Sequence, residues 1–476
     1  MKILIVVDNP VRDLSACTLL ATELSRQHQV YLTSMSQSAY ECFRLKPDLV
    51  ILNYLRVINL PLVYRMIACG IRYSILDTEG GVFSKIPGSN DNSYHKTLVK
   101  DQFSRDHVEH YFAWGTVLAQ DMKDRKVYPT KKIFCTGTPR TDFYHVSFRP
   151  FFVEKKEQNS RPMILINTSF PGNNPKFNTR ENEKKNLIAK FHYPAEFVEK
   201  MYSGLDTVMN KYIELTRYLA EKMPDVDFVL RPHPFESHQF YIDKLSNIKN
   251  VTVDGSDMVV KWILRSKALI HFQCSTAIEA GLSQIPSMSL SGYDHLREIQ
   301  GLSEVTEYCD SFAEMEKVLQ NILSGHHKIP DSVAVAIKTI ENEIYCKVDG
   351  KSYQRIADII SATDPSSKSS RFNLKEEIRN HTAEAGSSIN DKQKSILTIL
   401  KQRLLSNLYF SFYFLRSGFK WLAKRRLVPP AKRFSLNEVE SILEKLKTVE
   451  KISHCQSHAV FLSSAIQISS KATDSN

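Results

Sequence analysis

Short apolar runs alternate with longer amphipathic stretches along the first 150 residues. Runs of four or five mostly apolar residues predict buried strands, at 3–7, 30–33, 49–53, 73–77, 111–114 and 133–137. The intervals between them, among them 14–27 and 60–69, predict helices. Because short buried strands alternate with helices, we expect a parallel α/β sheet with right-handed crossovers.

A second series of the same kind starts at residue 163. Its expected strands lie at 163–167, 227–232, 251–254, 268–272 and 287–290, and its expected helices at 195–222, 312–323 and 333–342. Residues 151–160, FFVEKKEQNS, lack the pattern and form the expected linker. The sequence therefore predicts two tandem Rossmann-like domains, 1–150 and 161–360, that face a cleft where the carboxyl ends of the strands bind ligand.

The C-terminal part differs in composition. The polar segment 361–370, SATDPSSKSS, predicts a domain boundary before a third, basic and helical region at 371–476. Residues 401–433 hold nine Lys and Arg, seven aromatics and no Asp or Glu, and the net charge of +11 falls to +2 without those nine cations. We expect this segment to contact anionic lipid, with helices packed on the preceding domains as the alternative. Residues 436–446 predict a short helix capped by Ser435.

Composition narrows the class of protein. A chain of 476 residues with 42% hydrophobic and 24% charged residues is globular, and its near-neutral main part does not suggest a nucleic-acid binder. Eight single cysteines without a CxxC pair suit reduced thiols. The apolar run after Lys2 is too short for a signal peptide, and no run approaches the ~18–20 residues that cross a bilayer. We expect a cytoplasmic protein.

The sharpest chemical signal is Arg231-Pro232-His233-Pro234 at the end of an expected strand. Both prolines fix φ and push the residue before them into extended geometry, so His233 is held rigidly. The guanidinium of Arg231 suits a phosphate, and the imidazole can donate a further hydrogen bond. A turn with a structural histidine fits the motif equally well.

A second candidate, CSTAIEAG at 274–281, follows the expected strand at 268–272. Ser275 or Thr276 would cap a helix whose start can bind a nucleotide phosphate, and Glu279 can take ribose hydroxyls. An ordinary capped helix is the alternative. The RPHP motif about forty residues earlier in the same expected domain favours the phosphate site.

The first expected domain carries acids after a strand. Asp77 and Glu79 precede Gly80 and Gly81. Acids at a strand end suit a catalytic base or nucleophile, and glycines let another chain approach closely. A glycine turn with solvated acids is the alternative.

Arg140 and Asp142, in GTPRTD at 137–142, also follow an expected strand. They would line the same cleft, or belong to a turn that leads into the linker. The histidines at 233, 238 and 271 are irregularly spaced, with no acidic pair placed among them. We therefore expect no metal site.

Taken in order, DTEGG, GTPRTD, RPHP and CSTAIEAG resemble segments of bacterial surface-carbohydrate biosynthesis proteins. These are GT-B-type glycosyltransferases related to β-Kdo transferases. RPHP and the Ser-Thr element are also similar to the HP and Ser/Thr motifs of bacterial sialyltransferases. DTEGG is similar to their acidic-acidic-Gly motif, with Thr78 between the acids, and GTPRTD to a segment of transferases that use CDP-glycerol. The resemblance covers about residues 1–360 and implies a GT-B-like fold, and the basic C-terminal region also suits membrane-associated members of the family.

The resemblance implies a role for each donor-side residue. His233 would bind the donor phosphate and help the nucleotide leave, Ser275 and Thr276 would hold the same phosphate, and Glu279 would lie near the ribose. The remaining residues implied to bind substrate are Asp77, Gly80, Gly81, Arg140 and Arg231.

Two catalytic routes follow from the resemblance. Glu79 would be the base or proton shuttle for the acceptor hydroxyl in an inverting reaction. Asp142 would be the nucleophile if configuration is retained through a covalent adduct. The sequence leaves both routes open.

The expected donor is a CMP-activated acidic sugar, Kdo or sialic-acid-like, because His233 and Arg231 can neutralise its single phosphate without a metal or other cofactor. A UDP-sugar is not excluded. The expected acceptor is a glycan or lipid-linked glycan at the inner face of the inner membrane, in capsule or lipopolysaccharide assembly. The alternatives are a CDP-glycerol-type polyol phosphotransferase, a sugar-nucleotide epimerase, and a non-catalytic scaffold of glycan assembly.

Overall fold

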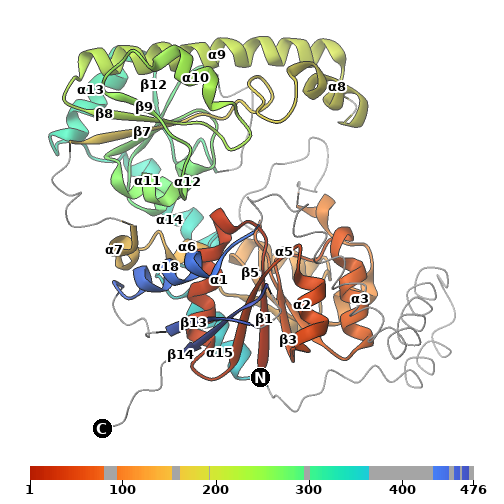
Figure 1. Ribbon diagram of the computed structural model, residues 1–476. Coiled ribbons are helices and arrows are strands. Elements are labelled where there is room, and N and C mark those ends of the chain that lie inside the picture. Colours follow the sequence, from red (N-terminus) through yellow and green to blue (C-terminus); the bar gives the residue numbers. More distant parts are fainter. Residues whose placement is uncertain are drawn as a thin grey trace, which may run out of the picture. The chain divides into compact units, whose positions relative to one another are not determined.

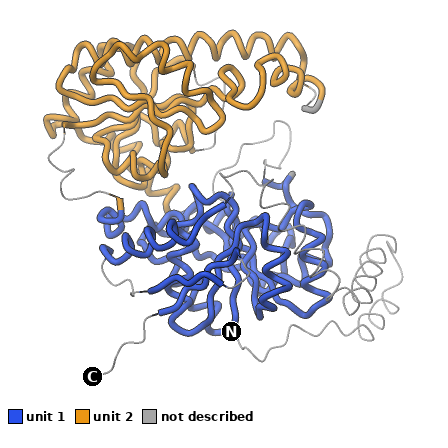
Figure 2. The backbone as a smooth tube through the Cα atoms, in the orientation of Figure 1, with its two compact units in different colours: residues 1–81, 91–151, 342–476 blue, residues 82–90, 152–341 orange. Residues whose placement is uncertain are grey.

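The computed structural model describes residues 1–79, 94–152, 161–191, 193–293, 301–363, 433–449, 455–460 and 464–470. The chain divides into two compact units, coloured separately in Figure 2. Unit 1 comprises Met1–Gly81, Asp91–Phe151 and Asn342–Asn476, and unit 2 comprises Val82–Asn90 and Phe152–Glu341. Each unit is built around its own β-sheet (Figure 1).

The sheet of unit 1 has the strand order β13-β14-β2-β1-β3-β4-β5-β6. Six of these strands were expected from the sequence and run parallel, with β1 paired to β2 from Lys2 opposite Gln29 to Val7 opposite Ser34. Their apolar runs are almost wholly buried, as expected for parallel strands covered on both faces. The six are β1 (Lys2–Val7), β2 (Gln29–Ser34), β3 (Leu49–Leu52), β4 (Arg72–Leu76), β5 (Val108–Ala113) and β6 (Ile133–Cys135).

Helices fill the connections of unit 1. Helix α1 (Pro10–Leu24) joins β1 to β2 and is buried around most of its circumference. A helix that is apolar on all sides needs a cover on its outer face as well as a sheet on its inner one. The other helices are α2 (Ser38–Leu45), α3 (Leu60–Ala68), α4 (Gln102–Asp106), α5 (Thr116–Asp124), α6 (Pro139–Asp142), α7 (Arg149–Phe152), α15 (Ser352–Ser361) and α18 (Leu436–Leu446).

The chain beyond residue 341 corrects the expected domain boundaries. Its described residues, 342–363, 433–449, 455–460 and 464–470, belong to unit 1, whereas 342–360 was placed in the second domain and the later residues in a third region. Helices α15 and α18 pack on α1, which explains the burial of α1. Strands β13 (Cys455–Ala459) and β14 (Ile466–Ser470) form a hairpin, and β14 extends the sheet antiparallel to β2. Helix α18 has the expected bounds and the expected cap, since Ser435 Oγ accepts the N–H of Glu438.

The returning chain passes closely over Gly115. A Cβ atom at this glycine would lie 2.2 Å from the carbonyl oxygen of Glu343 and 2.4 Å from the backbone of Ile344. The hydroxyl of Thr116 donates to the same Glu343 carbonyl at 3.4 Å. Only a residue without a side chain fits between β5 and α5 at this point.

The sheet of unit 2 has the order β12-β11-β10-β7-β8-β9, and all of its strands are parallel. The three-residue β12 was not expected, while the other five confirm the predicted strands. These strands are β7 (Met163–Asn167), β8 (Asp227–Arg231), β9 (Val251–Val253), β10 (Ala268–His271), β11 (Ser287–Leu290) and β12 (Glu307–Cys309). The six parallel strands in each of the two Rossmann-like sheets therefore confirm the expected α/β class.

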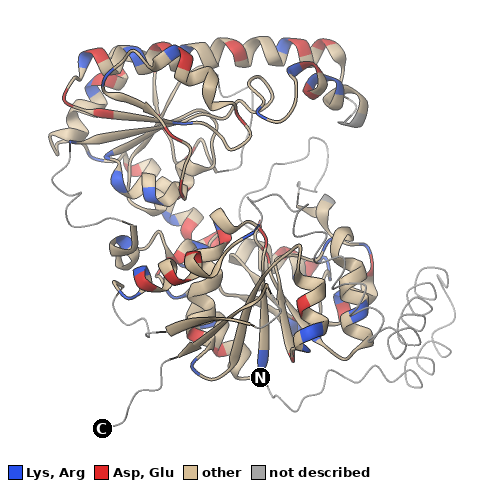
Figure 3. Ribbon diagram, in the orientation of Figure 1, with Lys and Arg blue, Asp and Glu red and all other residues tan. Residues whose placement is uncertain are grey.

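The long helix α9 (Ala195–Lys222) covers one face of this sheet, with the bounds expected from the sequence. It buries Val208, Tyr212, Leu215 and Leu219 at helical spacing against the apolar core of unit 2. Charged side chains lie mainly on the helices of both units, whereas the strands carry few (Figure 3). The other helices of unit 2 are α8 (Arg180–Phe191), α10 (His238–Leu245), α11 (Val259–Arg265), α12 (Thr276–Leu282), α13 (Phe312–Leu323) and α14 (Asp331–Glu343), which ends in unit 1.

Candidate functional site

In unit 2 the predicted residues gather at the carboxyl edge of the sheet. Strand β7 lies between β8 and β10, and Asn167 at its end is in register with both Arg231 and His271. The RPHP motif follows β8, and residues 273–276 follow β10. Neighbouring strand ends therefore bring the two sequence motifs together, as parallel sheets do at their ligand-binding edge.

The imidazole of His233 is held in one tautomer. The N–H of Phe235 donates to Nδ1 of His233 at 3.3 Å. A ring nitrogen that accepts a hydrogen bond carries no proton, so the neutral ring has its proton on Nε2. His233 can therefore offer Nε2–H to an anion at this edge.

Arg231 supplies a partly buried cation beside this histidine. One guanidinium nitrogen donates to the carbonyl of Asp257 at 2.9 Å. Its buried Nε has no hydrogen-bond partner among the described residues. Burial lowers the pKa of Arg231, and the nearby Cys274 and Glu279 oppose this. Arg231 thus keeps donor capacity for a ligand oxygen.

The Ser-Thr element differs in detail from the expectation. Neither hydroxyl caps α12: Ser275 makes no capping hydrogen bond, and the Thr276 hydroxyl donates to Cys274 Sγ at 3.1 Å. Thr276 also accepts the Nδ2–H of Asn167 at 2.9 Å. Glu279 is 8% exposed and lies within electrostatic reach of Arg231. Thr276 is therefore tied to the end of β7, and Glu279 is a neighbour of the arginine.

Sequence reasoning missed Asn167 in unit 2. Its side chain is 3% exposed, and its Oδ1 makes no hydrogen bond to any described residue. The only available signal was a polar residue at the end of the apolar run 163–166. A buried, unpaired amide oxygen at the ligand-binding edge of a sheet suits a ligand hydroxyl or amine.

In unit 1 the acids after β4 have different environments. Asp77 is 3% exposed and accepts the N–H of Glu79 at 2.8 Å and the hydroxyl of Tyr94 at 2.7 Å. Burial raises its pKa, while these two hydrogen bonds lower it. Asp77 therefore shapes the turn that leads to Glu79.

The Glu79 side chain is 46% exposed and lies between two arginines. A guanidinium nitrogen of Arg56 lies 2.5 Å from Oε2 of Glu79, and a guanidinium nitrogen of Arg12 lies 3.8 Å from Oε1. Arg12 also lies within electrostatic reach of Arg140. Sequence reasoning missed Arg12 and Arg56, because the partners are 67 and 23 residues from Glu79. The two arginines could hold an anionic group beside this accessible carboxylate.

Asp142 is completely buried and holds helix α15. Its two oxygens accept the first N–H groups of that helix, from Ser352 at 2.8 Å and from Tyr353 at 2.9 Å. Burial raises the pKa of Asp142 to about 6, against the lowering effect of these hydrogen bonds. This geometry is that of a helix cap.

We expect Asp142→Ala to lower the free energy of unfolding by ~1–3 kcal/mol at pH 5, because two helix N–H groups lose their acceptor. The folded pKa lies above the unfolded value of 3.8, so the wild-type contribution falls as the pH rises through about 6. The deficit of the variant should therefore shrink from pH 5 to pH 7. Urea denaturation at both pH values measures it, and wild-type stability at pH 5 would contradict the capping role.

Some expectations fall outside the described residues, namely Gly80, Gly81 and the basic aromatic segment up to residue 432. Within the described part of the chain, no group of three or more His, Cys, Asp or Glu side chains is arranged to hold a metal ion. In that same part, every helix is too short or too polar to span a bilayer.

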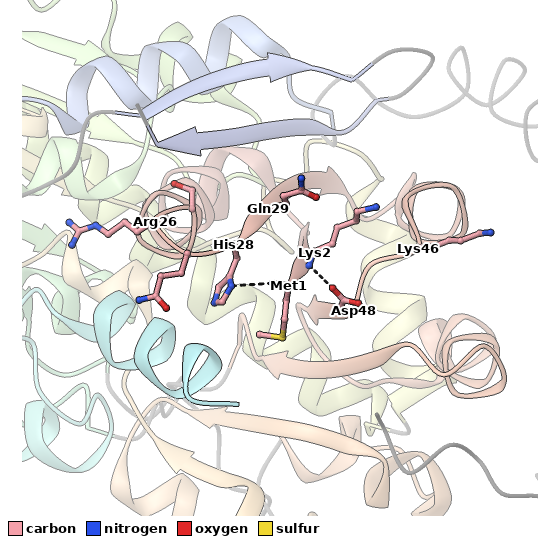
Figure 4. Close-up of a pocket in the computed structure, with 9 residues that line it drawn as sticks. Met1, Lys2, Arg26, His28, Gln29, Lys46 and Asp48 are labelled. Atoms are coloured by element: carbon pink, nitrogen blue, oxygen red, sulfur yellow. Dashed lines mark hydrogen bonds between the residues drawn. The ribbon is translucent and has the colours of Figure 1, made fainter. Parts of the chain in front are cut away.

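A recess of about 550 Å³ lies at the amino ends of β1 and β2 (Figure 4). Lys2, Arg26, His28 and Lys46 line it together with Asp48, which accepts the N–H of Lys2 at 2.6 Å. None of the residues predicted from the sequence lines this recess. It lies at the opposite strand ends from Asp77 and Glu79 and is not part of the candidate site.

Comparison with known proteins leaves the family open. No family model matches the sequence, and no curated protein matches it. Similar solved structures include UDP-GlcNAc 2-epimerase from Neisseria meningitidis bound to UDP-GlcNAc, which is 14% identical with a TM-score of 0.45 over 76% of this chain and 100% of that one. A variant of the wall teichoic acid polymerase TagF with CDPG is 13% identical, with a TM-score of 0.48 over 75% and 87% of the two chains. Values this low assign neither a ligand nor a reaction to this chain.

Proposed function

We propose that the protein is a nucleotide-sugar-dependent glycosyltransferase of bacterial surface polysaccharide assembly. The favoured donor is a CMP-activated acidic sugar, Kdo or sialic-acid-like. The observation that carries the proposal is the place of His233 at the carboxyl edge of a parallel sheet beside Arg231, with its Nδ1 accepting the Phe235 N–H. Ser275 and Thr276 belong to the same edge.

These residues match the chemistry of a departing nucleotide monophosphate. Negative charge grows on the phosphate as the glycosidic bond breaks, and fixed donors that meet this charge lower the barrier. His233 supplies a neutral N–H that can also pass its proton, and Arg231 supplies a permanent cation. The Oδ1 of Asn167, which has no hydrogen-bond partner in the described part of the chain, is a candidate acceptor for a hydroxyl of the sugar donor.

Glu79 is the proposed base for the acceptor hydroxyl. It is the accessible carboxylate of the DTEGG segment, whereas Asp77 is buried. Asp142 uses both oxygens as a helix cap, so the proposal contains no covalent adduct on it and favours an inverting reaction. The acceptor is a glycan or a lipid-linked glycan at the inner membrane, with residues 401–433 as the proposed lipid contact.

The test is CMP release from CMP-Kdo and CMP-sialic acid in the presence of lipid-linked acceptors. We expect Glu79→Gln to slow release by ~10²–10⁴-fold with CMP affinity unchanged, because the amide cannot take the acceptor proton. Glu109→Gln, which changes a partly exposed carboxylate on β5, is the matched control and should behave as wild type. Equal turnover in wild type and Glu79→Gln would contradict the assigned base.

A further inference from the structure

Glu236, two residues beyond the RPHP motif, is completely buried. Sequence reasoning did not select it. A carboxylate inside a protein is unfavourable unless donors fill its lone pairs. The identity of those donors therefore indicates what the residue is for.

Donors from three segments surround the Glu236 carboxylate. Oε1 accepts the N–H of Phe170 at 2.8 Å and the N–H of His233 at 3.2 Å. The hydroxyl of Thr168 lies 3.0 and 3.1 Å from the two oxygens, and the hydroxyl of Tyr241 donates to Oε2 at 2.5 Å. One side chain thus connects the loop after β7, the turn after β8 and helix α10.

The link between Glu236 and His233 runs in both directions. The N–H of Glu236 donates to the carbonyl of His233 at 2.8 Å, while the Glu236 side chain accepts the His233 N–H. Pro234 occupies the second position of the resulting turn, where its fixed φ is favourable. The same turn places the N–H of Phe235 against Nδ1 of His233.

The loop after β7 is paired to this turn. The N–H of Lys176 donates to the carbonyl of Phe235 at 2.8 Å, and the N–H of Ser237 donates to the carbonyl of Asn174 at 3.0 Å. Glu236 binds the start of that loop through Thr168 and Phe170, so its carboxylate spans both sides of the pairing. A shift of Glu236 would therefore move the backbone that holds the His233 ring.

We propose that Glu236 is a positioning residue, which holds His233 in the Nε2–H tautomer and aims that N–H at the ligand phosphate. A carboxylate suits this position because the two backbone N–H groups can only donate and both hydroxyls donate to it as well. A glutamine of the same size would direct an N–H₂ group at one of these donors. The link to ligand binding rests on the proposed function, whereas the effect on the His233 ring does not.

The experiment uses the full-length protein with ¹⁵N-labelled histidine. The ring nitrogens of His233, assigned by their loss in His233→Ala, report its tautomer and pH titration directly. We expect Glu236→Gln to convert the single Nε2–H form into a mixture of tautomers. Glu307→Gln, at a half-buried glutamate on β12 that lies 3.3 Å from His327, is the matched control and should leave the His233 signals unchanged.

Calorimetric titration of CMP supplies the second readout. Glu236→Gln should weaken CMP binding about tenfold, because a mispositioned donor loses most of a charge-assisted hydrogen bond. If Glu236 acts through His233, the double variant with His233→Ala should bind no more weakly than His233→Ala alone. Additive losses would overturn the positioning role.

The His233 ring signals test the positioning role of Glu236, and CMP binding by the wild-type protein tests the proposed function. Unchanged His233 tautomer and titration in folded Glu236→Gln would overturn the inference whether or not CMP binds. Absence of CMP binding by the wild-type protein would contradict the proposed function alone. If Glu236→Gln does not fold, Tyr241→Phe removes one hydrogen-bond donor from Oε2 of Glu236 and keeps the aromatic ring of residue 241. This variant should shift the same His233 signals.

Discussion

Replacement of His233 by alanine is expected to weaken CMP binding by roughly 10–100-fold, which is the value of a hydrogen bond to a charged group. Transfer should fall further, because the lost donor meets charge that is largest in the transition state. The ring can act this way because the Phe235 N–H fixes its proton on Nε2. Calorimetric titration of CMP and the rate of CMP release measure the two effects.

His326→Ala is the matched control for this experiment. His326 is an exposed histidine of unit 2 that follows α13, and its Nδ1 lies 2.9 Å from the Ser324 hydroxyl. The His326→Ala variant should bind CMP as tightly as the wild-type protein. If His233→Ala also binds and turns over normally while folded, His233 does not contact the ligand and the site assignment fails.

Gly115→Ala is expected to destabilise unit 1 by about 2–4 kcal/mol, among the larger effects of a single substitution. The new Cβ would lie 2.2 Å from the Glu343 carbonyl oxygen and 2.4 Å from the Ile344 backbone. Both are main-chain atoms, which cannot rotate away as a flexible side chain can. Thermal and urea denaturation of the purified variant measure the loss.

Gly325→Ala separates this steric effect from the conformational cost of losing a glycine. Gly325 has φ +75° and open space around its Cβ position. Alanine there should cost only about 1–2 kcal/mol, the penalty of left-handed backbone. If Gly115→Ala is as stable as the wild type, the chain at 343–344 does not lie against Gly115.

Much of the fold was predictable because its signals are local. Eleven parallel strands follow from short apolar runs, since both faces of each sheet are covered. Helices α9, α13 and α18 have the expected bounds because amphipathic spacing and caps are properties of neighbouring residues.

The C-terminal part was not predictable in the same way. Strands β13 and β14 contain mostly polar or small residues, CQSHA and IQISS, and lack a clear apolar alternation. Their place beside β2 depends on pairing across more than 400 residues, such as Ile466 with Leu32. The buried positions of α1 include Asp, Ser and Thr residues, so its sequence did not indicate that a further layer covers it.

The candidate site, like the fold, was predictable only where its signals are local in the sequence. His233 and Arg231 could be selected as candidates because proline-flanked polar residues at a strand end form a local pattern. Asn167 and the two arginines at Glu79 were missed because their roles arise from contacts between distant segments. The capping of helix α15 by Asp142 was not predictable for the same reason, since that helix begins 210 residues later.

In the proposed function, unit 2 binds a cytidine monophosphate through His233. The most direct test of this binding is thermal denaturation of the wild-type protein with CMP, CDP, UMP or UDP. A ligand at ~100 times its dissociation constant stabilises by ~2.7 kcal/mol, which is readily seen. We expect CMP to raise the melting temperature and His233→Ala to remove that shift. Stabilisation by UDP or CDP but not by CMP, or by none of the four, would contradict the account.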